Sequence, residues 1–203
     1  MTRVLVTGFE PFGGSTVNAS AEAVALLPDR IGDVDIVRAT LPCLFDEAPR
    51  RLALLIHEVS PDLVVAVGEA GGRTSVDVER VAVNLDDARI PDNAGRQPID
   101  RVIIDDAPVA YLSGLPVKAC AAAIDEVGVA SGVSNTAGTF VCNHVFFALM
   151  HMLEGQPERR GGFVHVPTLD RLSAAASATA LAAVIRSAAR TTEDIRVSRG
   201  AEF

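Results

Sequence analysis

Three side chains of this sequence could together cleave an acyl bond: Cys142, His165 and Glu79. Cys142 follows the turn SNTAG at the start of a strongly apolar segment. If a helix begins near Gly138 or Thr139, the thiol lies in its first turn, where unpaired N–H groups and the helix macrodipole favour an anion and lower a thiol pKa. A thiolate is a nucleophile, so this position predicts covalent catalysis. The competing interpretation is packing, because free cysteine is among the most buried residue types.

A nucleophilic thiol also requires a base. His165 interrupts the apolar pattern FVHVP near its carboxyl end, where it could reach the start of a neighbouring helix; the alternative is a hydrogen-bonded core histidine. Glu79 could fix the imidazole tautomer and stabilise the imidazolium, or it could form a salt bridge with an adjacent arginine. His144 is two residues from Cys142, roughly 200° around a helix, so it is expected to point away and to be structural.

Metal catalysis is disfavoured by the spacing of the remaining histidines. His57 and His151 lie within helical patterns, and His144 and His151 are about two turns apart, too distant to share one ion. The three cysteines match neither a zinc knuckle nor a CxxC redox pair, and we expect free thiols.

Elements that would position these side chains alternate along the chain. Short β-branched runs predict strands over residues 4–8, 34–41, 63–68, 78–84, 129–135 and 163–167. Helical patterns lie between them, over residues 20–27, 45–59, 118–128, 139–154 and 169–190. This alternation predicts a three-layer α/β/α fold around a mainly parallel or mixed sheet. Residues 84–102 break the rhythm with prolines and charges, and we expect a functional loop or an excursion from the sheet there.

Glycine-rich or polar residues follow several of the expected strands, which locates a site. Ligands of open α/β sheets bind beyond the carboxyl ends of the strands. The first such segment, GFEPFGG at residues 8–14, is neither GxGxxG nor GxxxxGK[ST], so a phosphate cradle is disfavoured. Phe9 and Phe12 instead predict the wall of an apolar pocket; ordinary core packing is the alternative.

Composition narrows the class of protein. The chain has 203 residues, 49% of them hydrophobic and 22% charged, which fits one globular domain spanning residues 1–203. A formal net charge of −8 without clusters of Lys and Arg argues against nucleic-acid binding. The N-terminus resembles no signal peptide and no apolar run is long enough to span a bilayer, so we expect a cytoplasmic protein with no membrane association.

Four segments together resemble the signature blocks of the pyroglutamyl peptidase I family, also called pyrrolidone carboxyl peptidases, which are cysteine peptidases. The blocks are TGFEPFGG, GEAGGR with ERVAVNLDDARIPDN, SNTAGTFVCNH and GGFVHVP, in the family's order. By this resemblance, Cys142 is the nucleophile, His165 the general base and acid, and Glu79 the third member of the triad. Other residues match family positions near the active site or lining the pyroglutamyl pocket: Arg89, and Phe9, Phe12, Ile90, Phe140 and Val141.

The resemblance implies an omega peptidase, a thiol protease that removes N-terminal 5-oxoproline from peptides through a thioester acyl-enzyme. No cofactor is required, and the substrate partner is a peptide with N-terminal pyroglutamate. A homotetramer is implied because members of the family are often tetramers. An apolar pocket suits the uncharged lactam, whereas an ordinary aminopeptidase would need a carboxylate for the substrate ammonium.

Two positions depart from the family pattern, Glu69 in place of Gln and Cys43 in place of Thr. An ionised carboxylate only accepts hydrogen bonds, so Glu69 could bind the lactam N–H but could not donate to its carbonyl. Its charge would also tend to raise the Cys142 pKa. The alternative is that Glu69 turns away and pairs with Arg73.

Two other classes of function are compatible with the same kind of fold. A noncatalytic binding protein for pyroglutamyl or related small amides would have no need of a nucleophile and its base. A phosphorylase or nucleosidase on a similar scaffold should carry a basic phosphate site, which is not found in the sequence.

Overall fold

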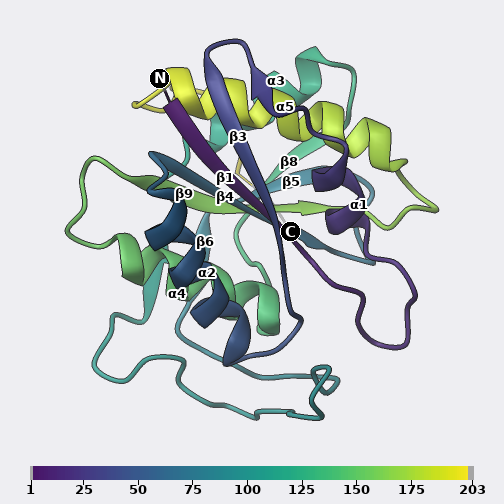
Figure 1. Cartoon of the computed structure of the whole chain (residues 1–203), viewed down its shortest axis with the longest axis vertical. Coiled ribbons are helices and arrows are strands. Elements are labelled where there is room, and N and C mark those ends of the chain that lie inside the picture. Colours follow the sequence, from purple (N-terminus) through teal and green to yellow (C-terminus); the bar gives the residue numbers. More distant parts are fainter. Residues whose placement is uncertain (1, 201–203) are drawn as a thin grey trace.

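A mixed sheet of seven strands forms the middle layer of the molecule (Figure 1). The structure is a computed structural model that describes residues 2–200. The strands of this sheet are β1 (Thr2–Phe9), β2 (Arg30–Ile31), β3 (Val34–Leu41), β4 (Leu63–Glu69), β5 (Val76–Glu79), β8 (Ser131–Ser134) and β9 (Arg160–Val166). Their order in space is β2-β3-β1-β4-β9-β5-β8. A separate two-stranded sheet pairs β6 (Val81–Val83) with β7 (Ala110–Leu112).

Helices cover both faces of the main sheet, which confirms the predicted α/β/α class. They are α1 (Ala19–Ala25), α2 (Glu47–Val59), α3 (Val117–Glu126), α4 (Val141–Leu153) and α5 (Ala174–Arg190). Helices α1, α3 and α5 lie on one face, and α2 and α4 lie on the other (Figure 1). None of the helices within residues 2–200 combines the length and apolar character needed to cross a bilayer.

The two faces of the sheet have different cores. Strand residues such as Val65 and Val164 pack with α1, α3 and α5 in an aliphatic core rich in Val, Leu and Ala. The opposite core, against α2 and α4, contains five buried phenylalanines: Phe9, Phe45, Phe146, Phe147 and Phe163. Central strands buried on both faces explain the near-continuous apolar runs of the sequence.

The direction of three strands differs from a simple parallel sheet: β2 is antiparallel to β3, and β5 and β8 run opposite to β9. Strands β1, β3, β4 and β9 are mutually parallel, whereas β5 is antiparallel to β9 and parallel to β8. The single strand predicted over residues 78–84 is also divided at Arg80, because β5 ends at Glu79 and the following β6 belongs to the second sheet. The short strands β2 and β7 were not predicted.

The predicted excursion lies outside the main sheet. Residues 84–102 form a loop between β6 and β7, closed at its base by a bridge between Asp86 and Arg101. The backbone of this loop is fastened to the SNTAG turn: Asp87 N–H donates to the Thr139 carbonyl at 3.0 Å, and Thr139 Oγ1 donates to the Asp87 carbonyl at 2.7 Å. The excursion therefore lies beside the residues that precede Cys142.

Candidate active site

Cys142 is the second residue of α4, which confirms the prediction that the thiol lies in a first helical turn. Gly138 adopts a left-handed conformation with φ of 78°, which glycine accommodates without strain, and Phe140 is extended before the helix begins. Phe140 makes no side-chain capping hydrogen bond to the helix. The N–H groups of the first turn thus lack a side-chain cap, and they are directed to the same region as the thiol.

The Cys142 thiol lies against Gly68 of β4. A Cβ atom added to Gly68 would be 2.7 Å from Cys142 Sγ and 2.9 Å from Phe163 Cζ, so only glycine leaves room for the thiol. Gly68 is the register partner of His165 on β9. Paired residues of neighbouring parallel strands direct their side chains to the same face, about 4.8 Å apart. The sheet thereby sets the imidazole of His165 one strand away from the thiol.

His165 contacts the carboxylate of Glu79. Its Nδ1 lies 2.7 Å from Glu79 Oε1, and both residues are buried, with 4% and 0% of their surface exposed. The antiparallel pairing of β5 and β9 opposes Asp77 to His165, so Glu79 reaches the imidazole diagonally from the neighbouring strand. Because Nδ1–H donates to the carboxylate, Nε2 is the ring nitrogen available to accept a proton.

The thiol pKa differs from the prediction. Burial raises the pKa of Cys142 above its ordinary value; Cys43, when ionised, and the charges of Glu79 and Glu69 act in the same direction, while Arg73 lowers the pKa. Desolvation therefore outweighs the helix N-terminus, since a charged thiolate loses the most when water is removed. The resting thiol is protonated, and a base must remove its proton before it can attack.

Aromatic side chains surround the approach to the thiol. The ring of Phe140 lies 5.9 Å from that of Phe12 and 5.4 Å from that of Phe45. Ile90 comes from the excursion to within 3.7 Å of the position that a Cβ on Gly13 would occupy. The predicted pocket residues Phe12, Phe140 and Ile90 are partly exposed, as a ligand wall requires.

The other predicted pocket residues lie differently. Phe9 and Val141 are buried, with 2% and 0% of their surface exposed, so they support the wall from behind. Arg89 is exposed on the excursion beside Ile90.

Side-chain hydrogen bonds hold the excursion against this aromatic wall. Asn93 Nδ2 donates to Glu10 Oε1 at 3.1 Å and to the Pro11 carbonyl at 2.9 Å. The buried carboxylate of Asp92 accepts from Phe45 N–H at 3.1 Å. These contacts join three segments that are far apart in the sequence into one rim.

A family comparison decides what kind of site this is. The family model described as pyroglutamyl peptidase matches residues 2–192. This chain belongs to the pyroglutamyl peptidase family.

Individual relatives agree along nearly the whole chain. The pyrrolidone-carboxylate peptidase of Streptomyces coelicolor is 50% identical, covering 99% of both chains, and that of an Enterobacter species is 51% identical over 86% of this chain and 82% of its own. The crystal structure of pyroglutamyl peptidase I from Bacillus amyloliquefaciens superposes with a TM-score of 0.93 at 41% identity, covering 96% of this chain and all of that one. Pyrrolidone carboxyl peptidase from Thermococcus litoralis has a TM-score of 0.92 at 33% identity, covering 98% and 100%.

Glu69 is directed to the helix α1 and not to Arg73. Its Oε2 accepts from Ala19 N–H at 2.6 Å, while Arg73 forms ion pairs with Glu79 and Asp77. The alternative interpretation, in which Glu69 turns away and pairs with Arg73, is therefore wrong about the partner: Glu69 turns to α1 instead. One carboxylate oxygen of Glu69 is occupied by the helix N-terminus, where a negative charge is favourable.

The second departure, Cys43, is buried beside Glu10. Its N–H donates to Glu10 Oε1 at 3.1 Å, and its carbonyl accepts from Asn93 N–H at 3.2 Å. Burial, followed by the charges of Glu10 and Asp92, raises the pKa of Cys43 to about 12. Cys43 is therefore a neutral, packed thiol at neutral pH.

His144, next but one to Cys142, has a separate carboxylate partner. Its Nδ1 lies 2.9 Å from Asp86 Oδ2, and Asp86 in turn forms an ion pair with Arg101 at 2.8 Å. The interpretation of His144 as structural agrees with this buried pair. Within residues 2–200, no group of three or more His, Cys, Asp or Glu side chains is placed to hold a metal ion.

Two residues at the site were not singled out by the sequence. Gly68 lies within an otherwise apolar strand, where a glycine often marks the close approach of another group. This position is the sequence signal that could have identified Gly68 as part of the site. From the sequence, Arg73 is expected only as an alternative partner for Glu69. Nothing in the pattern GEAGGR indicates that Arg73 contacts Glu79.

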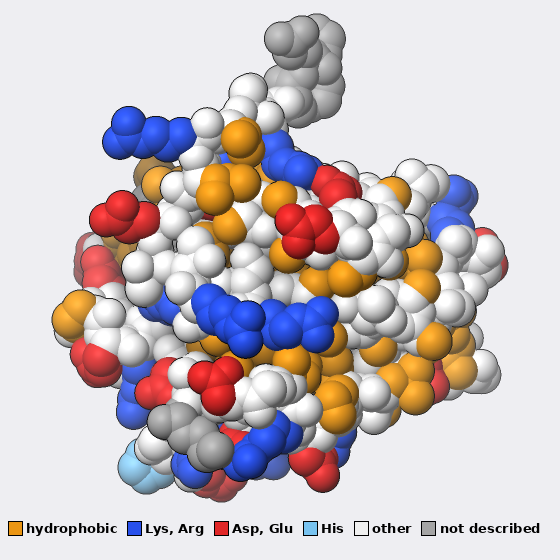
Figure 2. Space-filling view, turned by 90° about the horizontal axis from the view of Figure 1, so that it is seen from above, with side chains coloured by type: hydrophobic (Ala, Val, Ile, Leu, Met, Phe, Trp, Pro, Cys, Tyr) orange, Lys and Arg blue, Asp and Glu red, His pale blue; other side chains and the backbone are white. Residues whose placement is uncertain are grey.

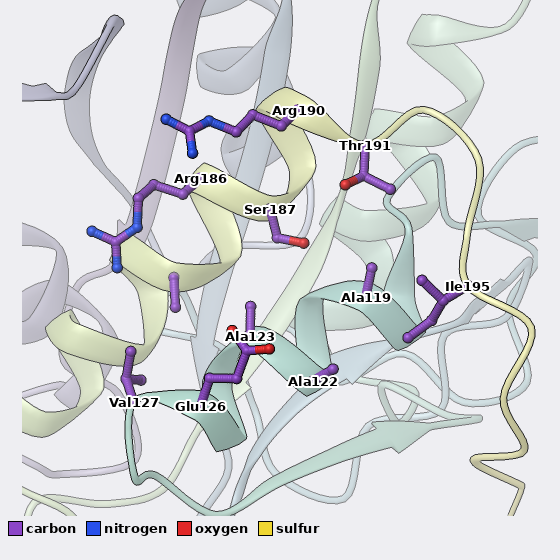
Figure 3. A pocket seen from close by; sticks show the side chains of 11 residues that line it. Ala119, Ala122, Ala123, Glu126, Val127, Arg186, Ser187, Arg190, Thr191 and Ile195 are labelled. Carbon is purple, nitrogen blue, oxygen red and sulfur yellow. The ribbon is translucent and has the colours of Figure 1, made fainter.

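A cavity of about 410 Å³ lies elsewhere, between α3 and α5 on the opposite face of the sheet (Figure 3). Arg186 and Arg190 extend from α5 along it, and alanines of α3 form its floor (Figure 3). The same side of the molecule, seen from above in Figure 2, carries a strip of Lys and Arg side chains between hydrophobic ones. The sheet separates this cavity from Cys142 and His165.

Proposed function

We propose that this protein is a pyroglutamyl peptidase I, a cysteine-type omega peptidase that removes N-terminal 5-oxoproline from peptides. The observation that carries the proposal is the thiol of Cys142 against Gly68, one strand from the His165–Glu79 pair, in a chain of this family. In the proposed triad Cys142 is the nucleophile, His165 the base and acid, and Glu79 the residue that holds the imidazole.

The proposed reaction begins with transfer of the Cys142 thiol proton to His165 Nε2. The sulfur then attacks the pyroglutamyl carbonyl carbon, and the carbonyl oxygen becomes an oxyanion that the N–H groups at the start of α4 stabilise. Glu79 holds the Nδ1–H tautomer and stabilises the imidazolium. His165 next donates its proton to the amine of the departing peptide as the C–N bond breaks, which leaves a thioester on Cys142.

Hydrolysis of the thioester completes the cycle. His165 accepts a proton from water, and the resulting hydroxyl attacks the thioester carbonyl. The C–S bond breaks, the proton on His165 returns to sulfur, and free 5-oxoproline leaves. The enzyme returns to its resting state with a neutral thiol, consistent with the raised pKa of partly buried Cys142.

The substrate pocket is proposed to consist of the aromatic rim and its supporting residues. Phe12, Ile90 and Phe140 would contact the lactam ring, with Phe9 and Val141 behind them, and Arg89 and Glu69 would approach its polar edge. The ring is small and uncharged, so apolar contact and a few hydrogen bonds are sufficient to recognise it.

Hydrolysis of a chromogenic pyroglutamyl amide tests this proposal. The parent protein should release the chromophore, and Cys142→Ala should release none above background, because the acyl-enzyme cannot form. Release by neither protein would overturn the peptidase function, and equal release by both would overturn the role of Cys142. A rival binding protein for pyroglutamyl amides would retain the ligand without releasing the chromophore.

We further propose that the protein is a cytoplasmic homotetramer. Exposed apolar side chains around β7 and the excursion support self-association, since Val109 and Leu112 are 87% and 69% exposed. Light scattering coupled to size-exclusion chromatography should give four times the chain mass, and Val109→Asp should reduce it. Cell fractionation tests the location.

A further inference from the structure

One guanidinium group contacts both the strand that carries Glu79 and the turn that leads into the Cys142 helix. Arg73 Nη1 lies 2.7 Å from Glu79 Oε1 and 2.9 Å from Asp77 Oδ2. Its Nη2 donates to the Thr136 carbonyl at 3.0 Å and to Ser134 Oγ at 3.2 Å. Arg73 is thus hydrogen-bonded both to the proposed triad acid and to the turn that leads into the Cys142 helix.

The contact with Glu79 involves the oxygen that also accepts from His165. Glu79 Oε1 lies 2.7 Å from His165 Nδ1 and 2.7 Å from Arg73 Nη1, and the carboxylate is fully buried. The second oxygen, Oε2, has no hydrogen-bond partner among the described residues. The position of this carboxylate therefore depends on two partners, and Arg73 is the one that is always charged.

Strand β8, which pairs with β5, leaves room for the Asp77 carboxylate that contacts Arg73. Gly132 of β8 pairs in register with Asp77, and a Cβ on Gly132 would lie 2.4 Å from Asp77 Oδ1. The Asp77 carboxylate that holds Arg73 therefore occupies the space of a missing side chain. A second hydrogen bond, from Ser75 Oγ to Asp77 Oδ1 at 2.8 Å, fixes this carboxylate.

We propose that Arg73 is a positioning residue for the reaction: it fixes the charged Glu79 carboxylate toward His165 and fastens the SNTAG turn that sets Cys142. This inference rests on the proposed peptidase function and extends it to a residue that does not touch the substrate. The partly buried guanidinium attracts the fully buried Glu79 carboxylate, and its planar fork allows one side chain to hold a carboxylate and a carbonyl at once.

The two roles have separable consequences. Without Arg73, Glu79 would be a buried carboxylate held only by the imidazole, and the thiol would lose its one cationic neighbour that favours the thiolate. Removal of Arg73 should lower kcat and leave KM nearly unchanged, because it affects proton transfer and not the aromatic pocket. The rate at which Cys142 is alkylated should also shift to higher pH.

The test uses the full-length protein with Arg73→Gln, Arg73→Lys and a matched control, Arg101→Gln. Arg101 also pairs with a buried carboxylate that holds a histidine, but that histidine is His144. We expect Arg73→Gln to lower kcat about 100-fold with KM within about threefold, since misplaced catalytic groups typically cost that much. Arg73→Lys should recover part of the loss, because the charge returns without the fork, and Arg101→Gln should keep kcat within about threefold.

Alkylation of Cys142 by iodoacetamide, followed against pH by mass spectrometry of the modified peptide, provides a readout independent of turnover. The charged or titratable groups around the thiol are His165, Cys43, Glu79 and Glu69, and Arg73. Arg73→Gln removes only the positive charge of Arg73 from this set. The pH at which alkylation accelerates should therefore be higher in Arg73→Gln and unchanged in Arg101→Gln.

Several results would overturn the proposal. Folded Arg73→Gln with unchanged kcat and an unchanged alkylation profile would do so, as would equal losses in Arg73→Gln and Arg101→Gln. If Arg73→Gln does not fold, Asp77→Asn, which weakens one anchor of the guanidinium, should lower kcat by a smaller factor; unchanged kcat there would contradict the proposal. If the parent protein fails to hydrolyse pyroglutamyl amides, the proposed function fails, while the alkylation profiles still decide the effect of Arg73 on the thiol.

Discussion

Two clusters of this protein, each around a buried carboxylate, have the same composition: a histidine, a carboxylate and an arginine. In the first, His165 Nδ1 lies 2.7 Å from Glu79, which lies 2.7 Å from Arg73. In the second, His144 Nδ1 lies 2.9 Å from Asp86, which lies 2.8 Å from Arg101. Both carboxylates are completely buried, so neither these distances nor the burial of the carboxylates distinguishes the clusters.

What distinguishes them is the neighbour of each imidazole. His165 lies one strand from Gly68, where the absence of a side chain admits the Cys142 thiol. His144 packs edge-on against Phe45 with ring centroids 5.6 Å apart, and it borders a cavity of about 430 Å³. An imidazole held by a carboxylate is therefore a structural element by default, and a nucleophile beside it gives it a catalytic role.

Replacing each histidine by glutamine should separate the clusters most strongly. His165→Gln should lower kcat/KM about 10³-fold, because the base and the acid for amine departure are lost together. His144→Gln should keep kcat/KM within about threefold and lower the free energy of unfolding by about 1 to 3 kcal/mol, since it weakens a buried hydrogen bond to a charged group. Chromophore release and urea unfolding measure the two quantities.

The comparison would fail if His144→Gln, once folded, lost as much kcat/KM as His165→Gln. A double variant provides a further check, because effects on two independent clusters should add within about 0.5 kcal/mol of unfolding free energy.

Adding a methyl group at Gly68 should displace the Cys142 thiol, so that the imidazole of His165, like that of His144, would have no nucleophile in place beside it. Gly68→Ala would place a Cβ 2.7 Å from Cys142 Sγ, so the thiol or Phe163 must move. A displacement of this size should lower kcat about 100-fold and destabilise the fold by about 1 to 3 kcal/mol. Gly71→Ala is the control, because its nearest contact would be 3.8 Å away, at Thr168; similar kcat losses in both variants would contradict the packing argument.

The smallest effect concerns Glu69, whose charge acts on the first cluster alone. Its negative charge raises the Cys142 pKa, so Glu69→Gln should lower that pKa and increase kcat/KM near neutral pH by about twofold to fivefold. The amide oxygen can still accept from Ala19 N–H, so stability should change little. Glu69→Ala, which removes that acceptor, should cost about 1 kcal/mol of unfolding free energy. Unchanged or lower kcat/KM in Glu69→Gln would argue against a role in the site.

Most of the elements could be predicted from local patterns. β-Branched runs between glycines and prolines indicated β1, β3, β4 and β9, and the turn SNTAG before an apolar segment indicated the start of α4. These signals are local because β1, β4 and β9 are buried on both faces along most of their length and each helix has its own apolar side. The family blocks added the expected site residues by resemblance.

The remaining features depend on long-range contacts that a local pattern does not contain. The apolar run at residues 78–84 gave no sign that Glu79 ends one sheet and that residues 81–83 enter another. Nothing in VASGV fixed the direction of β8 relative to β4. The thiol pKa followed from burial at the sheet and not from the helix position, and the partner of Arg73 was decided by which strand lies beside β9.

Strand β9 occupies the middle of the sheet although it is synthesised late. It is inserted between β4 and β5, both of which precede it by many residues in the chain. A nascent chain that already includes Glu79 and Cys142 still lacks β9, the strand that carries His165 between β4 and β5. The proposed catalytic triad is therefore complete only after the strand carrying His165 has been synthesised and has paired with β4 and β5.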